Sequence, residues 1–127
     1  MANILLIDDD DLVAEGLAEV LRRAGHSVAA ARTGHEALSV VGRLQADLVI
    51  TDVLMPGMDG IELIRALRSH SYRMPIIAMS GGGLLDARTV LDMASALGAT
   101  AVLTKPIKRQ ELLPLVDRCL AAPQVKL

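Results

Sequence analysis

Short runs of Ile, Leu and Val alternate along the chain with longer stretches whose apolar residues recur at helical spacing. Such runs are typical of buried parallel strands, and each strand needs a crossover helix to reach the next one. The alternation therefore predicts an α/β domain whose parallel sheet is covered by helices on both faces. Five strands are expected, the second being the weakest: Asn3 to Ile7, Ser27 to Ala31, Leu48 to Thr51, Ile76 to Met79 and Ala101 to Leu103.

The stretches between the runs predict helices from about Asp11 to Ala24, Thr33 to Gly42, Ile61 to Arg68, Leu84 to Leu97 and Lys108 to Ala122. Asp10 or Asp11 and Thr33 are the expected N-caps, because their short polar side chains can accept from free amides in the first turn. Pro114 removes a backbone donor inside the last helix, which predicts a kink or a displaced helix. Residues 1–122 form one domain in this interpretation, and residues 123–127 form a frayed tail.

Composition excludes several classes of protein. The apolar runs stay well below the roughly 18 residues of a membrane-spanning helix, and no cleavable leader precedes the first strand, so no membrane insertion is expected. One cysteine, Cys119, lies among helical apolar residues, which favours core packing in a reducing cytoplasm. A net charge of -2 and a single aromatic residue, Tyr72, disfavour direct nucleic-acid binding.

Polar side chains follow four of the expected strands. Asp8 and Asp9 follow the first strand, Asp52 the third, Ser80 the fourth and Lys105 the fifth. Open parallel sheets bind ligands outside the carboxyl ends of their strands, so these side chains should converge. Clustered carboxylates suit Mg²⁺, while an ammonium and a hydroxyl suit phosphate oxygens. Each residue alone could be a cap, a loop residue or a surface charge, but together they predict phosphoryl transfer to an aspartate.

Two continuous motifs carry a resemblance to a known family. They are Ile-Leu-Leu-Ile-Asp-Asp-Asp at residues 4–10 and Asp-Val-Leu-Met-Pro-Gly-Met-Asp-Gly at residues 52–60, followed by Ser80 and Lys105-Pro106. With them the chain resembles the receiver domain of two-component response regulators, of the single-domain chemotaxis type. The resemblance covers nearly the whole chain. It implies a flavodoxin-like fold with strand order 2-1-3-4-5.

The resemblance also implies roles for the acidic residues. Asp52 would accept the phosphoryl group and would ligate Mg²⁺, or Mn²⁺ in its place. Asp9 would be a direct ligand of the same ion, and Asp8 would act mainly through metal-bound water. The backbone carbonyl of Leu54 would be a further metal ligand.

The remaining motif residues imply contacts with the phosphoryl group itself. Ser80 would close on it, Lys105 would pair with it, and the bond before Pro106 is expected to be cis. The donor would be a phosphohistidine on a sensor histidine kinase or a histidine phosphotransfer protein. The output would be binding to a downstream protein, relay of the phosphoryl group, or a phosphorylation-dependent dimer.

One position departs from the family pattern. Receivers commonly carry a tyrosine or phenylalanine three residues before the lysine, where this chain has Val102. The usual rotating ring is therefore replaced, in our hypothesis, by movement of Ser80 and the glycines at 81–83, whose backbone has wide conformational freedom. The alternative is that these glycines only form a flexible turn.

Two other functions share features with this set of residues. An aspartyl-phosphate phosphohydrolase would need an acid-base aspartate two residues after the nucleophile, where this chain has Leu54. A receiver fold used only for interaction would not need the full set of site residues. The expectation is therefore a protein that is no turnover enzyme and that catalyses only its own phosphorylation and dephosphorylation. A receiver cut out of a larger regulator with an output domain is the alternative.

Overall fold

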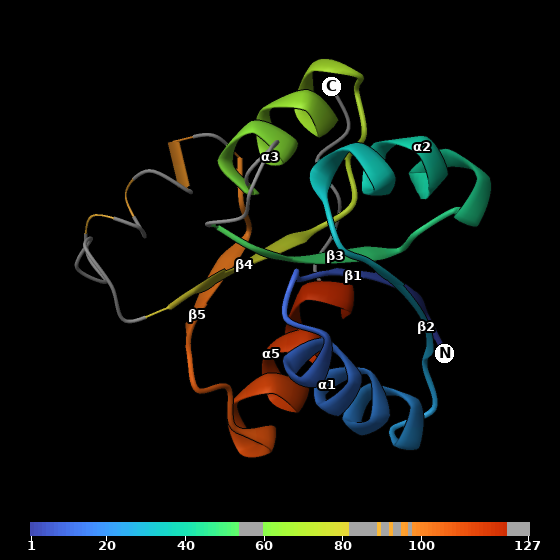
Figure 1. Ribbon diagram of the computed structural model, residues 1–127, viewed down its shortest axis with the longest axis vertical. Helices are drawn as coiled ribbons and strands as arrows, with labels where there is room; N and C mark the ends of the chain where they lie inside the picture. The colour runs from blue at the N-terminus through green and yellow to red at the C-terminus, as the bar shows by residue number, and fades with distance from the viewer. Residues whose placement is uncertain (54–59, 82–88, 90–91, 93–94, 97, 122–127) are drawn as a thin grey trace.

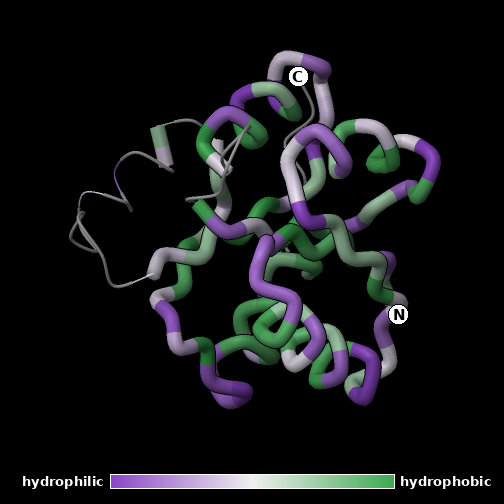
Figure 2. Tube along the Cα trace, in the orientation of Figure 1, coloured by the Kyte–Doolittle hydropathy of each residue, from purple (hydrophilic) through white to green (hydrophobic). Residues whose placement is uncertain are grey.

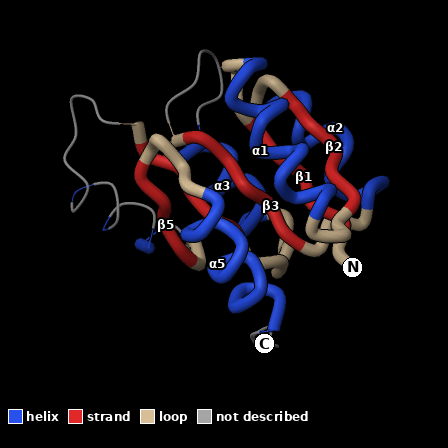
Figure 3. The backbone as a smooth tube through the Cα atoms, turned by 90° about the horizontal axis from the view of Figure 1, so that it is seen from below, coloured by secondary structure: helices blue, strands red, loops and turns tan. Residues whose placement is uncertain are grey.

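The computed structural model describes residues 1–53, 60–81, 89, 92, 95–96 and 98–121. Its centre is a parallel sheet of five strands in the order β2-β1-β3-β4-β5, as the sequence predicted. Figure 1 shows this sheet between two layers of helices, and Figure 3 shows it from below. The strands are β1 (Asn3–Ile7), β2 (Ser27–Ala31), β3 (Leu48–Asp52), β4 (Ile76–Ser80) and β5 (Ala101–Thr104).

Four helices have described bounds: α1 (Asp11–Arg23), α2 (Gly34–Leu44), α3 (Gly60–Ser69) and α5 (Arg109–Ala121). Both predicted caps are confirmed. The Asp10 side chain accepts from the amides of Leu12 and Val13 at the start of α1, and Thr33 accepts from the amide of Glu36 at the start of α2. The helix expected near residues 84–97 lies mostly outside the described residues, and so does the predicted tail.

Alternation along the strands divides the core into two layers. In β1, Leu5 and Ile7 pack with α2 and α3, whereas Ile4 and Leu6 pack with α1 and α5. Successive side chains of a strand point to opposite faces, and both faces here are covered, so β1, β3 and β4 are apolar almost throughout. Figure 2 shows the resulting hydrophobic centre, with hydrophilic segments at the turns.

Helix α5 contains Pro114 and continues on both sides of it. Its inner face includes Cys119, which is 5% exposed, so the prediction of core packing for this residue is confirmed. Burial raises the pKa of its thiol, although the charge of Arg118 opposes this effect. Among the described residues, no helix has both the length and the apolar character that crossing a bilayer requires.

Candidate functional site

The side chains of Asp8, Asp52 and Lys105 face the same side of the sheet because of their positions along the strands. Asp52 alternates in step with Leu48 and Ile50 on β3, so its side chain points to the same face as theirs. Leu48 and Ile50 pack toward α1 and α5. Strand geometry also continues one residue past β1 and β5, where the Asp8 amide donates to Ala31 O at 3.1 Å and the Lys105 amide to Ser80 O at 2.7 Å. Because side chains alternate, Asp8 and Lys105 point to the face that Asp52 shares.

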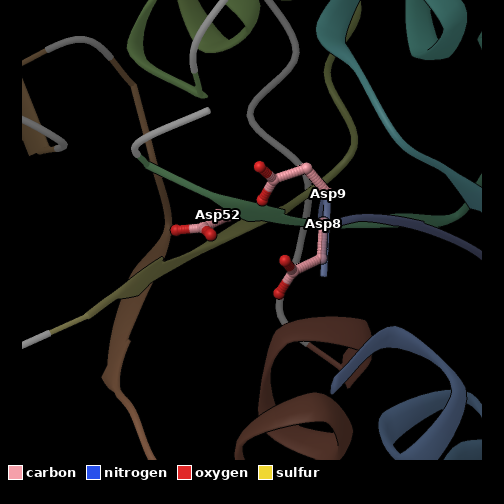
Figure 4. A group of neighbouring side chains, drawn as sticks. All are labelled: Asp8, Asp9 and Asp52. Carbon is pink, nitrogen blue, oxygen red and sulfur yellow. The ribbon is translucent and has the colours of Figure 1, made fainter. Parts of the chain in front are cut away.

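Three carboxylates meet at the carboxyl ends of β1 and β3 (Figure 4). One oxygen from each of Asp8, Asp9 and Asp52 lies within 4.8 Å of the others. The side chain of Asp8 is fully buried, and that of Asp52 is 12% exposed. The Asp10 amide donates to Asp8 Oδ1 at 2.9 Å, which fixes the buried carboxylate against the start of α1.

Lys105 neutralises part of this cluster. Its Nζ lies 2.8 Å from Asp8 Oδ2 and 3.0 Å from Asp52 Oδ2. Burial alone would lower the pKa of Lys105, but the hydrogen bonds and charges of Asp8 and Asp52 outweigh it and raise that pKa. The ammonium therefore stays charged at neutral pH. The bond from Lys105 to Pro106 is cis, as expected from the sequence.

Ser80 is the last residue of β4 and is 4% exposed. Its position places it at the same edge of the sheet, but its hydroxyl donates to the carbonyl of Gly81 at 3.3 Å. Ser80 alternates in step with Ile76 and Ala78 along β4, and these two residues pack on the face covered by α2 and α3. Val102 is partly buried against that same layer. The predicted ligand Leu54 and the glycines at 82 and 83 lie outside the described residues.

Gly60 supports the end of β3, a contact that sequence reasoning did not assign. Its amide donates to Val53 O at 2.9 Å. A Cβ built on Gly60 would fall well inside van der Waals contact with the carbonyl oxygen of Asp52 and 2.8 Å from Val53 Cα. That Asp52 carbonyl also accepts from the Thr51 hydroxyl at 3.0 Å. A glycine at the start of α3 therefore lets the helix lie directly on the backbone that carries the central carboxylate.

We expect Gly60→Ala to lower the free energy of unfolding by about 1 to 3 kcal/mol, because backbone atoms must shift to admit the methyl group. Urea unfolding measures this loss. Gly16→Ala is the matched control, since a Cβ on Gly16 in α1 meets nothing within 4 Å. That variant should gain up to about 1 kcal/mol from helix propensity. Equal stability of Gly60→Ala and wild type would contradict the close contact.

Comparison with known proteins identifies the family. A family model described as the response regulator receiver domain matches residues 4–117. The chain belongs to this receiver family. The resemblance carried by the two acidic motifs, Ser80 and Lys105-Pro106 is thereby confirmed at the level of the family.

Relatives of this receiver are longer proteins. It is 38% identical over 117 residues to the response regulator protein FleR of Pseudomonas aeruginosa, covering 92% of this chain and 24% of that protein. It is 40% identical over 116 residues to the DNA-binding response regulator MtrA of Mycolicibacterium smegmatis, covering 89% of this chain and 48% of that protein. The chain thus spans from about a quarter to about half of the length of these relatives.

Solved structures of similar proteins agree with the fold of the receiver. A response regulator from Chloroflexus aurantiacus is 38% identical with a TM-score of 0.88, the alignment covering 95% of this chain and 98% of that one. The chemotaxis protein CheY4 of Vibrio cholerae is 32% identical with a TM-score of 0.85, covering 94% and 98%. Both pairings cover nearly the whole of each chain.

The residues of this receiver fit a divalent cation. Mg²⁺ takes oxygen ligands and is usually held by one or two carboxylates while it keeps several waters. Asp9 and Asp52 offer such oxygens within reach of each other. Asp8 is buried, and its two oxygens already accept from the Asp10 amide and from Lys105. Its position therefore favours a supporting role beside the ion over direct ligation.

Proposed function

We propose that this receiver accepts a phosphoryl group on Asp52 from a phosphohistidine and signals through the phosphorylated form. The observation that carries the proposal is the setting of the Asp52 carboxylate. It lies at the open end of the central strand, with two further carboxylates within 4.8 Å and the Lys105 ammonium 3.0 Å away. A nucleophile beside both a candidate cation site and a fixed cation meets the electrostatic needs of phosphoryl transfer.

In the proposed reaction, a carboxylate oxygen of Asp52 attacks the phosphorus of the donor. The new bond is an acyl phosphate, and the phosphorus–nitrogen bond breaks with its electron pair going to the imidazole, which then takes a proton. Asp9, Asp52 and the Leu54 carbonyl would hold a divalent ion, Mg²⁺ or Mn²⁺, with Asp8 in a supporting role, and the ion would neutralise charge on the phosphoryl oxygens. Lys105 then pairs with the phosphoryl group in place of the Asp52 carboxylate, and the Ser80 hydroxyl turns from Gly81 to donate to it.

The chemistry implies two kinds of partner. The donor is a sensor histidine kinase or a histidine phosphotransfer protein, because a receiver in a two-component system is loaded by a phosphohistidine. The output is phosphorylation-dependent protein binding, a phosphorylation-dependent dimer or relay of the phosphoryl group. The protein turns over no other substrate in this account, and it acts in the cytoplasm, where its kinase partner presents the phosphohistidine.

A second possibility is favoured by the lengths of the relatives. The chain covers 24% of FleR and 48% of MtrA, and MtrA is described as a DNA-binding response regulator. The same receiver could therefore control an attached output domain. In that case the phosphorylation chemistry at Asp52 is unchanged, and only the readout differs.

The proposal is tested with a small phosphodonor, which removes the need for the unidentified kinase. We expect the protein to gain the mass of one phosphoryl group when Mg²⁺ is present. Excess chelator should abolish the gain, because the clustered carboxylates would then repel an incoming anion. Intact-protein mass spectrometry measures both reactions, and Asp9→Asn should need more Mg²⁺ for the same uptake. Uptake that chelator leaves unchanged would contradict the metal-dependent mechanism.

A further inference from the structure

The strand that carries Lys105 has little apolar burial to hold it in register. All five residues of β3 and of β4 are buried, whereas only Leu103 is buried in β5. Strand register is specified strongly where one face is buried and weakly elsewhere. Strand β5 also lies at the edge of the described sheet, where its ladder runs along β4. Something besides apolar packing must fix the position of β5.

Arg68, near the end of α3, makes hydrogen bonds that can fix the position of β5. Its Nε and Nη2 donate to the carbonyl of Gly98 at 3.1 Å and 2.7 Å. Its Nη1 donates to the carbonyls of Tyr72 and Met74 at 2.9 Å and 2.8 Å. One planar guanidinium thus ties the connection that leads into β4 to the turn that leads into β5, a geometry that only the arginine fork provides.

The turn at Gly98 is shaped for this contact. Gly98 has φ +105°, a conformation that L side chains rarely adopt. A Cβ there would lie 3.0 Å from both Cγ and Nε of Arg68. The absence of a side chain therefore lets the guanidinium reach the Gly98 carbonyl directly.

We call the contacts of Arg68 with the carbonyls of Gly98, Tyr72 and Met74 the clamp. Two residues after Gly98, the ladder between β4 and β5 begins. The Thr100 amide donates to Ile76 O at 2.7 Å, and the Ile76 amide donates to Thr100 Oγ1 at 3.0 Å. At the opposite end of the ladder, the Lys105 amide donates to Ser80 O at 2.7 Å. A slip of one residue moves a strand by about 3.3 Å. That shift would break contacts of 2.8 Å and 3.0 Å between the Lys105 ammonium and the two carboxylates.

We propose that Arg68 is a positioning residue for Lys105, setting the register of β5 from the far end of the sheet and thereby the reach of the ammonium to Asp8 and Asp52. The register effect stands on geometry alone. Its consequence for phosphoryl uptake rests on the function proposed above. A guanidinium that merely stabilises the domain would leave the position of Lys105 unchanged as long as the protein is folded.

Two variants break the clamp from opposite sides, Arg68→Ala by removing the donors and Gly98→Ala by obstructing the carbonyl. Arg65→Ala is the matched control for a charge lost from the same helix, since Arg65 is exposed. Val41→Ala, on the buried face of α2, is the control for lost stability without a change near β5. All four variants are compared with wild type well below their unfolding transitions.

The deciding readouts are two NMR signals of Lys105. The first is hydrogen exchange of its backbone amide, and the second is the resonance of its ε-ammonium, whose protons exchange slowly only while held in salt bridges. In Arg68→Ala and Gly98→Ala we expect the amide to exchange at least about tenfold faster than in Val41→Ala, and the ammonium signal to be lost. The exposed Lys108 serves as the internal reference for an unprotected ammonium.

Phosphoryl uptake from a small donor is followed in the same variants. We expect it to slow by about tenfold or more when the clamp is broken, because misplaced catalytic groups lose rate steeply. If both Lys105 signals in the clamp variants match those of Val41→Ala, the positioning role is wrong. If wild type itself takes up no phosphoryl group, the proposed function fails, and the two NMR signals alone decide the inference.

Discussion

Asp52→Asn is expected to abolish phosphoryl uptake while the domain stays folded. The amide has nearly the shape of the carboxylate but lacks the nucleophilic charge, so no acyl phosphate can form. Lys105 keeps Asp8 as a partner at 2.8 Å, and therefore the site should not collapse. The loss should be complete within the sensitivity of mass spectrometry after incubation with Mg²⁺ and a small phosphodonor.

The matched control for this change is Asp117→Asn. Asp117 lies exposed on α5, away from the carboxylate cluster, and its replacement removes the same charge. Wild type and the Asp117 variant should gain one phosphoryl group each, and the Asp52 variant none. A mass gain in the Asp52 variant equal to that of the control would show that another residue accepts the group.

The second large effect is expected from Lys105→Met. The Asp8 side chain is fully buried, and the Lys105 ammonium 2.8 Å away is its charge partner. Removing one member of a buried ion pair leaves the other charge uncompensated. We expect the free energy of unfolding to fall by about 3 kcal/mol, the lower end of the range for such pairs. The lower value is expected because the lysine side chain is 20% exposed and solvent screens the pair in part. The metal-free variant should therefore unfold at clearly lower urea concentration.

The same substitution should strengthen cation binding, because the lysine occupies carboxylate oxygens and repels a divalent ion. A gain of 1.4 kcal/mol corresponds to about tenfold tighter binding of Mg²⁺. Titration calorimetry and urea unfolding with and without Mg²⁺ measure both effects. Lys108→Met, at an exposed lysine, should leave stability and affinity unchanged. Unaltered metal-free stability of Lys105→Met would contradict the counterion role of the lysine.

The strands and the site could be predicted from the sequence because both depend on local pattern. Apolar runs mark the strands, and the position just past each run marks the edge where ligands bind. Three strands end one residue later than predicted, with Asp52, Ser80 and Thr104 as the last residues of β3, β4 and β5. The Val53 amide, which donates to Met79 O at 3.0 Å, shows how the ladder extends past the apolar run.

Contacts between distant segments could not be predicted. Arg68 looks like a solvated residue on the polar side of an amphipathic helix, and nothing near it in sequence indicates that it reaches Gly98. Gly60 was recognised as part of a motif, but its contact with the Asp52 carbonyl depends on how α3 packs. Both interactions arise from tertiary packing, which residue pattern does not specify.

Reductive trapping tests the central claim most directly. Borohydride reduces an acyl phosphate on aspartate to the alcohol, so the phosphorylated residue becomes homoserine and is located by peptide sequencing in a mass spectrometer. After treatment with Mg²⁺ and a small phosphodonor, we predict homoserine at position 52. Homoserine at Asp8 or Asp9, or an unmodified Asp52 in protein that has gained a phosphoryl group, would contradict the assignment of Asp52 as the acceptor.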